Sequence, residues 1–299
     1  MLKAGFLATI QDYGRLGHGA QGMSRCGVMD EHAYCWGNYL LDNHFKAAAI
    51  EITFGAFELE ATQACLIAVT GADLDFRING VRAQLWHSLQ ISPGDHLSWG
   101  MPKSGVRAYL CVRGGFNTQL LFDARSVNLR EHIGRKIGCG EVLKCDESSA
   151  SADRFMPTEY LPNYGNEVVL RLLPSYQFSE FSINQRDLFF NQTYHMSNAS
   201  DRSGCRLSGA PIALKRERMI SEGMSYGSVE IATDGLPIIL LKDAPTIGGY
   251  PKIGTVFSLD LSLLAQQQPG AKIRFVPTTI DQAQTERLKF NRFFDIVER

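Results

Sequence analysis

The densest set of residues that could do chemistry follows an apolar run at residues 238–241. Two adjacent glycines, Gly248 and Gly249, precede Tyr250 and, after one proline, Lys252. A glycine pair lets the backbone adopt positive φ angles or lie directly against a ligand, and successive backbone N–H groups can hold a phosphate or carboxylate. Tyr250 adds a ring and a hydroxyl, and Lys252 adds a cation. The pattern indicates an anion-binding loop, although a tight turn beside a solvated lysine has the same composition.

Acidic and basic side chains also occur close together in three other segments. Arginine neutralises anionic oxygens, and carboxylates accept protons or coordinate metal ions. Together with Lys252, the candidate catalytic residues are Asp12, Arg15, Asp30, Asp201, Arg202 and Asp243. Such Asp–Arg pairs are also common as structural salt links. We expect the glycine-rich first loop and the 201–206 segment to meet around one cavity, although they lie in different predicted domains.

Glu222 is the only ionisable group in a further loop at 219–225. We therefore add it to Gly248, Gly249 and Tyr250 as a candidate for substrate binding. The same loop contains G-x-S-x-G at 223–227, the pattern of a hydrolase nucleophile elbow, which requires a helix after the serine. The residues that follow alternate like a strand, so we do not expect a serine hydrolase.

Composition excludes several classes of protein. The chain has 299 residues with 30 basic and 31 acidic side chains and no basic block, so neither nucleic acid nor an anionic membrane is an expected partner. No apolar run approaches the ~18 residues of a membrane span, and the first residues are too weakly apolar for a signal peptide. The seven cysteines are scattered without C-x-x-C spacing, which predicts reduced thiols in a cytoplasm. The seven histidines are equally scattered and form no H-E-x-x-H motif, so no metal site is expected.

Short strands dominate the predicted elements. Between residues 50 and 145, short apolar or alternating segments are separated by turns such as Asn79-Gly80, which favours a β-barrel or sandwich over a βαβ sheet. Helices are expected at 30–41, with Asp30 as a cap, at 184–190, and after the capping box 279–282. The Ser-, Pro- and Asn-containing stretch 151–166 predicts a linker, giving domains at 1–150 and 167–299, the second with a terminal helix.

Six separated motifs then occur in one order over nearly the whole chain. They occupy residues 9–17, 27–30, 70–73, 200–207, 221–223 and 248–252. In this order the sequence resembles the allophanate hydrolase subunit 2, or KipA-like, family. That family includes the C subunit of bacterial 5-oxoprolinase and part of the carboxyltransferase region of urea carboxylase. The resemblance implies an all-β chain of two cyclophilin-like β-barrel domains in tandem.

The resemblance also implies a reaction and partners. The reaction is the ATP-dependent opening of 5-oxoproline to glutamate, with a KipI-like B subunit and a separate A subunit, and with ATP and Mg²⁺ as the bound cofactors. One alternative is a biotin-dependent carboxyltransferase acting on a urea-type substrate, with biotin carried elsewhere because this chain has no Ala-Met-Lys-Met site. Another is a KipA-like regulator that binds a KipI-like kinase inhibitor.

The chain departs from the family pattern at four positions. Before the glycine pair the family commonly has Gln-Thr-Thr, where this chain has Pro245, Thr246 and Ile247. The family commonly has methionine where this chain has Ser203, and glutamine where it has Glu230. Losing an amide and a hydroxyl beside the glycine pair removes hydrogen-bonding groups on which specificity often depends. The small-molecule substrate, a cyclic amide or a urea-type compound, is therefore expected to be recognised differently.

Overall fold

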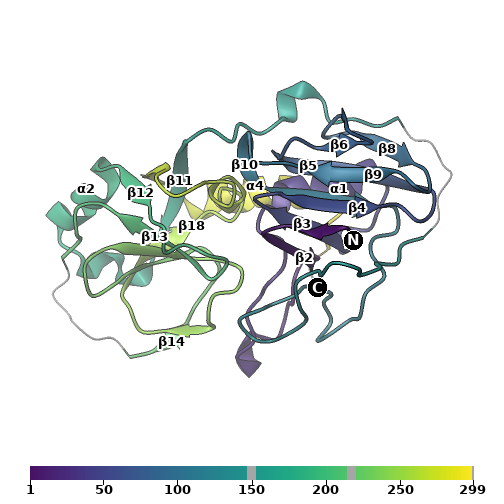
Figure 1. The fold of residues 1–299 in the computed structure, drawn as a ribbon. Helices are drawn as coiled ribbons and strands as arrows, with labels where there is room; N and C mark the ends of the chain where they lie inside the picture. Colours follow the sequence, from purple (N-terminus) through teal and green to yellow (C-terminus); the bar gives the residue numbers. More distant parts are fainter. Residues whose placement is uncertain (147–152, 214–219, 298–299) are drawn as a thin grey trace. The chain divides into compact units, whose positions relative to one another are not determined.

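The chain forms two compact units, each assembled from separate stretches of sequence. The computed structural model describes residues 1–146, 153–213 and 220–297 (Figure 1). The first unit contains Met1–Arg15, Asp30–Tyr164 and Arg292–Arg299, and the second contains Leu16–Met29 and Gly165–Asn291. The chain therefore enters the second unit early, at Leu16, before returning to complete the first.

Two five-stranded sheets make up the first unit. In spatial order, one sheet contains β1 (Lys3–Ala4), β4 (Phe57–Glu60), β9 (His96–Trp99), β6 (Arg77–Ile78) and β7 (Val81–Arg82). The other contains β2 (Leu7–Gln11), β3 (Ala49–Thr53), β10 (Ser104–Val112), β5 (Cys65–Asp73) and β8 (Ser88–Ile91). All the pairings are antiparallel, as the short, closely spaced strands predicted.

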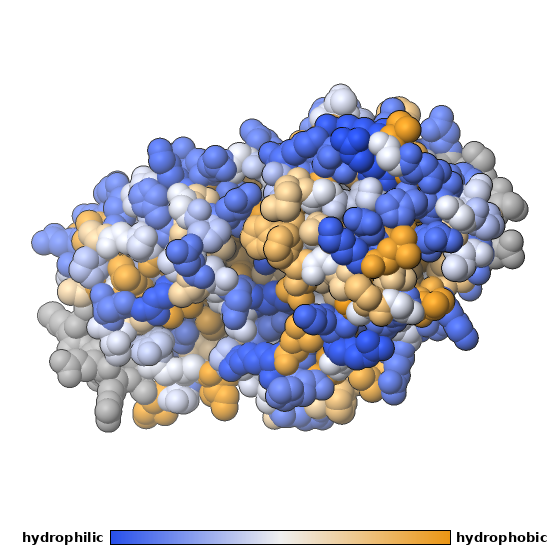
Figure 2. Space-filling model, viewed as in Figure 1, coloured by the Kyte–Doolittle hydropathy of each residue, from blue (hydrophilic) through white to orange (hydrophobic). Residues whose placement is uncertain are grey.

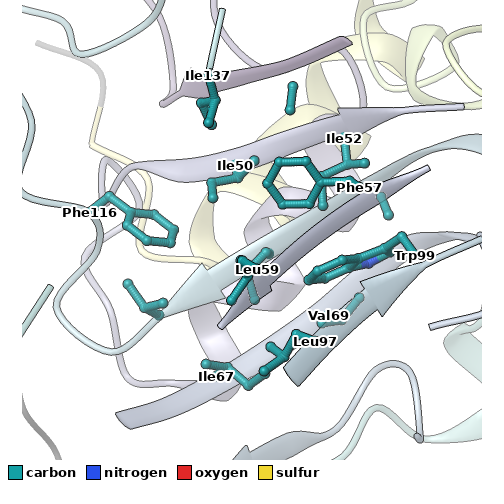
Figure 3. Packing of buried hydrophobic residues seen from close by; sticks show 14 of the residues in the cluster. Ile50, Ile52, Phe57, Leu59, Ile67, Val69, Leu97, Trp99, Phe116 and Ile137 are labelled. Carbon is teal, nitrogen blue, oxygen red and sulfur yellow. The ribbon is translucent and has the colours of Figure 1, made fainter. Parts of the chain in front are cut away.

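Alternation along the strands builds the core of this unit. Ile50 and Ile52 of β3 are fully buried among apolar side chains contributed by both sheets, including Phe57 and Trp99 (Figure 3). Successive residues of a strand point to opposite faces, so Glu51 lies on the other face of the same sheet. Glu51 is nevertheless only 1% exposed, and its carboxylate accepts a hydrogen bond from the Tyr109 hydroxyl at 2.8 Å.

The helix α1 (Glu31–Leu40) packs on β5 and β10. Its first turn is capped by Asp30, whose carboxylate accepts a hydrogen bond from the Ala33 N–H at 2.9 Å, as predicted. Near its other end, Trp36 packs against Phe293 and Phe294, with ring centres 5.4 and 5.6 Å apart. The C-terminal phenylalanines thus contribute to the first unit.

The second unit is a closed barrel of seven strands. Around the barrel they are β11 (Glu167–Pro174), β18 (Lys252–Val256), β15 (Ser228–Ile231), β16 (Pro237–Leu240), β13 (Gly204–Ser208), β12 (Tyr194–Met196) and β19 (Lys272–Pro277). Only β11 and β19 pair in parallel among these described strands. A separate pair, β14 (Glu222–Gly223) and β17 (Ile247–Gly248), is antiparallel.

Short helices complete the second unit. They are α2 (Ile183–Asn191), α3 (Leu261–Leu264) and most of α4 (Ile280–Phe293). Thr279 and Gln282 make the predicted capping box, since the Gln282 N–H donates to the Thr279 hydroxyl at 3.3 Å and the Gln282 amide accepts from the Thr279 N–H at 3.4 Å. The strand predicted after 227 is β15, in agreement with the rejection of a nucleophile elbow.

The prediction of a mainly β chain with two β-rich domains and few short helices is confirmed. The two units differ from the predicted domains in two segments, because Leu16–Met29 belongs to the second unit and Arg292–Arg299 to the first. The predicted linker 151–166 contains a short 3-10 helix, Thr158–Tyr160. Its residues 151 and 152 lie outside the described residues.

Candidate functional site

The glycine pair and Lys252 belong to a polar network at one side of the second barrel. Strand pairing brings its members together: β14 places Glu222 opposite Gly248 of β17, and β15 places Glu230 opposite Lys252 of β18. Three stretches that are distant in sequence therefore meet at the loop that was predicted to bind an anion. We call Glu222, Glu230, Gly248 and Lys252, with the side chains that bond to them, the β14–β17 network.

Lys252 lies at the centre of this network. Its Nζ is 3.0 Å from Glu222 Oε1 and donates to the Gly223 carbonyl oxygen at 3.4 Å. The Tyr176 hydroxyl donates to the second oxygen of the same carboxylate. Gln177 donates through Nε2 to the Tyr176 hydroxyl at 2.8 Å, and its Oε1 accepts from the Lys252 backbone N–H at 2.6 Å. The ammonium is thus neutralised by a carboxylate, and 14% of the lysine side chain is exposed.

Glu230 brings a second carboxyl group into the network, in a different environment. Its side chain is buried, and among the described residues Oε1 has no hydrogen-bond partner. The other side of the carboxyl group is held by the backbone N–H of Tyr250. A Cβ at Gly248 would lie 2.5 Å from Glu230 Oε1 and 2.7 Å from the Met224 Cε. Any larger residue at 248 would therefore require the ends of the Glu230 and Met224 side chains to shift.

The two carboxyl groups titrate in opposite directions. The hydrogen bond from Tyr176 and the charge of Lys252 lower the pKa of Glu222. Burial raises the pKa of Glu230, although the Tyr250 N–H and the Lys252 charge oppose that rise. A pair of carboxyl groups with diverging pKa values is the arrangement that acid–base catalysis uses, one group ionised and the other favouring its protonated form.

Of the two reasons predicted for the glycine pair, the need for positive φ angles is wrong, and close approach to a ligand stays a prediction. Gly248 and Gly249 are absent from the glycines with positive φ angles in the described chain. The requirement at Gly248 is space for Glu230 and Met224, both of which a Cβ at that position would approach too closely.

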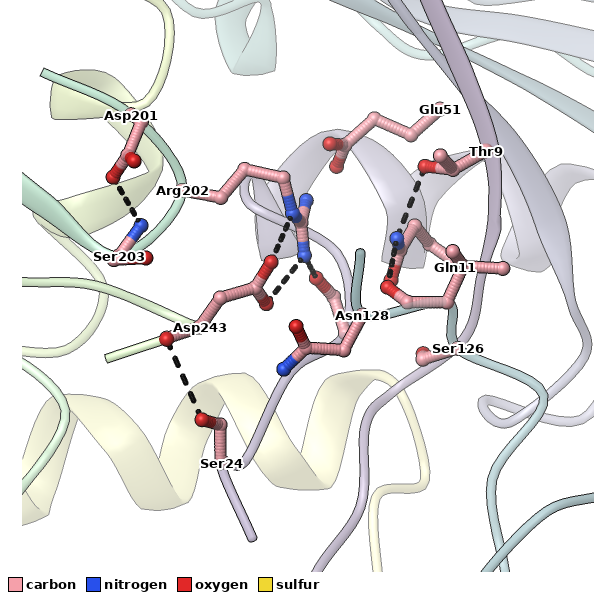
Figure 4. Close-up of polar contacts among 12 residues, drawn as sticks. Thr9, Gln11, Ser24, Glu51, Ser126, Asn128, Asp201, Arg202, Ser203 and Asp243 are labelled. Atoms are coloured by element: carbon pink, nitrogen blue, oxygen red, sulfur yellow. Dashed lines mark hydrogen bonds and ion pairs between the residues drawn. The ribbon is translucent and has the colours of Figure 1, made fainter. Parts of the chain in front are cut away.

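Arg202 and Asp243 form a separate, buried ion pair in the same unit (Figure 4). The Arg202 Nε and Nη2 donate to the two Asp243 oxygens at 2.8 and 3.1 Å, and Nη2 also donates to the Gly27 carbonyl oxygen at 2.7 Å. Ser24 donates to the Asp243 carbonyl oxygen at 3.4 Å. The bond to Gly27 brings the first loop into contact with the 201–206 segment; that the two meet around one cavity stays a prediction. This bidentate pair holds Leu16–Met29 against the end of β16.

Asp201 has a local role beside this pair. Its carboxylate accepts from the backbone N–H groups of Ser203 at 2.7 Å and Gly204 at 3.2 Å, which closes the turn before β13 (Figure 4). The side chain is exposed.

Asp12 and Arg15 lie together in the first unit, joined through Ser126. The Ser126 hydroxyl donates to Asp12, whose other oxygen accepts from the Arg125 N–H at 2.6 Å. Arg15 Nη2 donates to the Ser126 carbonyl oxygen at 3.3 Å. Both side chains are buried, and their hydrogen bonds hold the 125–126 backbone against the first loop.

Asp30 is fully buried in the first unit and holds several groups at once. Besides capping α1, its carboxylate accepts from the Tyr164 hydroxyl at 2.9 Å, and its own N–H donates to the Tyr109 hydroxyl at 2.8 Å. These bonds position the start of the helix, with no side-chain atom of Asp30 left on the surface.

The structure thus distributes the predicted residues over separate groups. Of the residues predicted from the sequence, Glu222, Gly248, Tyr250 and Lys252 belong to the β14–β17 network. Gly249 lies between Gly248 and Tyr250 in the sequence. Sequence reasoning missed Tyr176 and Gln177 of the network, for which no local pattern gives a signal. It noted Glu230 only as a departure from the family, although a carboxylate in a strand otherwise made of Ser, Val and Ile was a usable signal.

The acidic and sulfur-containing side chains do not converge on a metal site. Within residues 1–146, 153–213 and 220–297, no group of three or more His, Cys, Asp or Glu side chains is placed to hold a metal ion. The described side chains therefore offer no preformed metal site of three or more such ligands, and no chemical step is assigned to a metal ion.

On the face drawn in Figure 2, apolar side chains form small groups among hydrophilic ones. In the part of the chain that the structure describes, no helix has the length and apolar character needed to cross a membrane.

Comparison with known proteins identifies relatives over the whole chain. Residues 21–277 match the family described as carboxyltransferase domain, subdomain A and B. The chain is 34% identical to the C subunit of 5-oxoprolinase from Haemophilus influenzae, over 98% of this chain and 95% of the relative. It is 31% identical to the C subunit of the Escherichia coli 5-oxoprolinase, over 99% and 96% of the two chains.

A solved structure shows the same fold within a larger protein. The Kluyveromyces lactis urea carboxylase superposes with a TM-score of 0.89 at 26% identity, covering 98% of this chain but 28% of that one.

Proposed function

Because the chain belongs to the carboxyltransferase domain, subdomain A and B, family, we propose that it is the C subunit of an ATP-dependent 5-oxoprolinase. The observation that carries the proposal is that this chain and each of the two 5-oxoprolinase C subunits align over nearly their full lengths. The identities are 34% and 31%, over at least 95% of each relative. The proposal includes a KipI-like B subunit, an A subunit, ATP with Mg²⁺, and a cytoplasmic location. None of the cysteines in the described part of the chain forms a disulfide, which supports that location.

The proposed reaction converts 5-oxoproline, ATP and two water molecules into glutamate, ADP and phosphate. A lactam opens slowly at neutral pH unless its carbonyl is activated, and transfer of a phosphoryl group to the amide oxygen would activate it. Opening the ring also requires a proton on the departing nitrogen.

Within this chain, we assign substrate contact and proton handling to the β14–β17 network. Glu230 favours its protonated form because it is buried, whereas Tyr176 and Lys252 keep Glu222 ionised. Glu230 would supply the proton, and Glu222 would orient the Lys252 ammonium towards anionic oxygen. The side chain of Tyr250, next to the glycine pair in sequence, is exposed.

Reconstitution tests this function. The chain would be mixed with its B and A subunits, and ADP release and glutamate formation would be measured with and without 5-oxoproline. We expect turnover that depends on 5-oxoproline, and loss of at least tenfold in the Lys252→Gln variant. Lys272→Gln, which changes an exposed lysine on β19 of the same unit, serves as the matched control. A complex that assembles but hydrolyses no ATP in response to 5-oxoproline would overturn the proposal.

The family description and the urea carboxylase fold favour a second candidate function, a biotin-dependent carboxyltransferase acting on a urea-type substrate. Biotin would be carried by another domain or chain. Carboxyl transfer that requires an added biotin carrier, without turnover of 5-oxoproline, would select this alternative. Binding to a KipI-like partner with neither activity would select a KipA-like regulatory protein.

A further inference from the structure

The first unit contains a cavity of about 720 Å³ that is distant in sequence from the network above. We call it the basic cavity and define it by three cationic side chains and a glycine pair: Lys46, Arg113, Arg125, Gly114 and Gly115. It lies between the segment after α1 and the loop that follows β10.

The cations of the basic cavity lack acidic partners. Among the described residues, none of Lys46, Arg113 and Arg125 makes an ion pair with a carboxylate. Lys46 does lie over the Phe45 ring at 5.6 Å.

Two carboxylates also line the cavity, and they offset little of this charge. Asp42 is already paired with Arg154. That leaves Asp146, beside Gly114, as the acid that faces the three cations, so the described lining carries an excess of positive charge. Three cations against one available carboxylate leave a net positive charge around the cavity, which attracts an anion with more than one charge.

The wall of the basic cavity is fixed before any ligand binds. Gly114 and Gly115 both have positive φ angles, of 79° and 78°. The Gly114 N–H donates to the Asn43 side chain at 2.8 Å, and Asn43 also donates to the Val112 carbonyl oxygen at 2.8 Å. A Cβ at Gly115 would lie 3.0 Å from the Ala47 Cβ, so the loop is packed closely against the segment after α1. A preformed cavity loses less entropy when it binds a ligand.

We propose that the basic cavity binds a small molecule bearing phosphate groups. Two guanidinium groups suit phosphate because their planar N–H donors bind its oxygens in pairs, and the lysine adds a point charge. The volume falls in the range of small-molecule sites and exceeds what a single inorganic phosphate fills. The ligand class is therefore a compound with several phosphates, such as a nucleoside triphosphate or an oligophosphate. This site does not depend on the proposed oxoprolinase reaction.

Calorimetric titration of the full chain tests the site, with ATP, tripolyphosphate, inorganic phosphate and a dicarboxylate as separate probes. We expect ATP and tripolyphosphate to bind more tightly than phosphate or the dicarboxylate, with affinity falling as salt is added. The Arg113→Gln/Arg125→Gln double variant should bind tripolyphosphate about ten- to a hundredfold more weakly, the loss expected for charge-assisted hydrogen bonds.

Lys136→Gln, an exposed lysine of the same unit outside the cavity, is the matched control and should bind as the unaltered chain does. If the double variant fails to fold, Lys46→Gln changes a single exposed side chain of the cavity and should still weaken binding at least severalfold. Equal affinity for tripolyphosphate in the cavity variants and the control would overturn the proposal. Absence of binding by the unaltered chain at millimolar probe, or tighter binding of the dicarboxylate, would overturn it as well.

Discussion

Replacing Glu230 by glutamine should stabilise the protein at neutral pH and leave it unchanged in acid. Glutamine has nearly the same shape, and its amide oxygen can still accept the hydrogen bond from Tyr250. The substitution removes only the possibility of a buried negative charge. Since burial raises the pKa of Glu230, the folded protein resists the ionisation that the unfolded chain undergoes freely.

The sign follows from linkage between proton binding and folding. At a pH below the unfolded pKa, Glu230 is protonated in both states, and the native chain and the variant should be equally stable. As the pH rises above that value, the unfolded chain loses the proton first, so the native chain becomes less stable than the variant. The difference stops growing once the pH exceeds the raised folded pKa.

The size of the effect can be judged from the carboxyl group's contacts. One oxygen is held by an N–H group and the other has no partner among the described residues. At a pH above both pKa values, each tenfold increase in the proton affinity of the folded carboxyl group costs about 1.4 kcal/mol of stability, which glutamine does not incur. For a chain of this size, each kcal/mol changes the melting temperature by about 2–4 °C.

Thermal melts of Glu230→Gln and the native chain, at steps from about pH 4 to about pH 8, measure this difference across the range in which a raised carboxyl pKa acts. Glu60→Gln, which changes an exposed carboxylate on β4, is the control and should follow the native chain throughout. A Glu230→Gln variant that is less stable than the native chain at the upper end of this range, or equally stabilised at the lower end, would refute the reasoning.

Three further predictions concern other contacts. Lys252→Gln breaks the ion pair with Glu222 and should lower the free energy of unfolding by about 1 kcal/mol, because the pair is only partly exposed; urea titration measures it, and an unchanged midpoint would contradict it. Asp243→Asn removes the charge from a buried bidentate pair and should cost about 3 kcal/mol in the same assay. The hydrogen bond from Cys65 lowers the pKa of Cys145 to about 7, so alkylation of Cys145 should slow as the pH falls below that value. Cys65→Ala should slow that alkylation at neutral pH, and an unchanged rate would argue against the bond.

Local patterns in the sequence account for most of the fold. Phe57 and Leu59 alternate with acidic residues, which predicted β4, and the structure buries both side chains in the core. The capping box at 279–282 predicted the start of α4, and Asp30 predicted that of α1. These features depend on residues within a few positions of each other, so they can be recognised without tertiary contacts.

The division into units and the composition of the network depend on long-range bonds that no local pattern encodes. Leu16–Met29 joins the second unit through bonds such as the one from the Cys26 N–H to the Lys242 carbonyl oxygen, at 2.7 Å, between residues far apart in sequence. Tyr176 reaches Glu222 in the same manner. The sequence could nominate Glu222 and Lys252 separately, but only strand pairing shows that they form an ion pair.

The four departures from the family pattern differ in what they can change. Ser203 acts through its backbone, since its N–H donates to Asp201 and its carbonyl oxygen accepts from Leu241, so the side chain contributes little. Pro245 and Ile247 are exposed, and Ile247 pairs with Gly223 through the backbone, so these two change the outer surface of the loop.

Glu230 alone alters a buried position within the network. A glutamine there could neither gain nor release a proton, whereas the carboxyl group can do both in the pH range that its raised pKa makes accessible. If the network handles a proton during the reaction, the departure at 230 is the one that changes the chemistry, and Glu230→Gln should reduce turnover of the reconstituted complex while it raises the melting temperature. A gain in stability together with unchanged turnover would assign Glu230 to the barrel wall and leave proton transfer to another group.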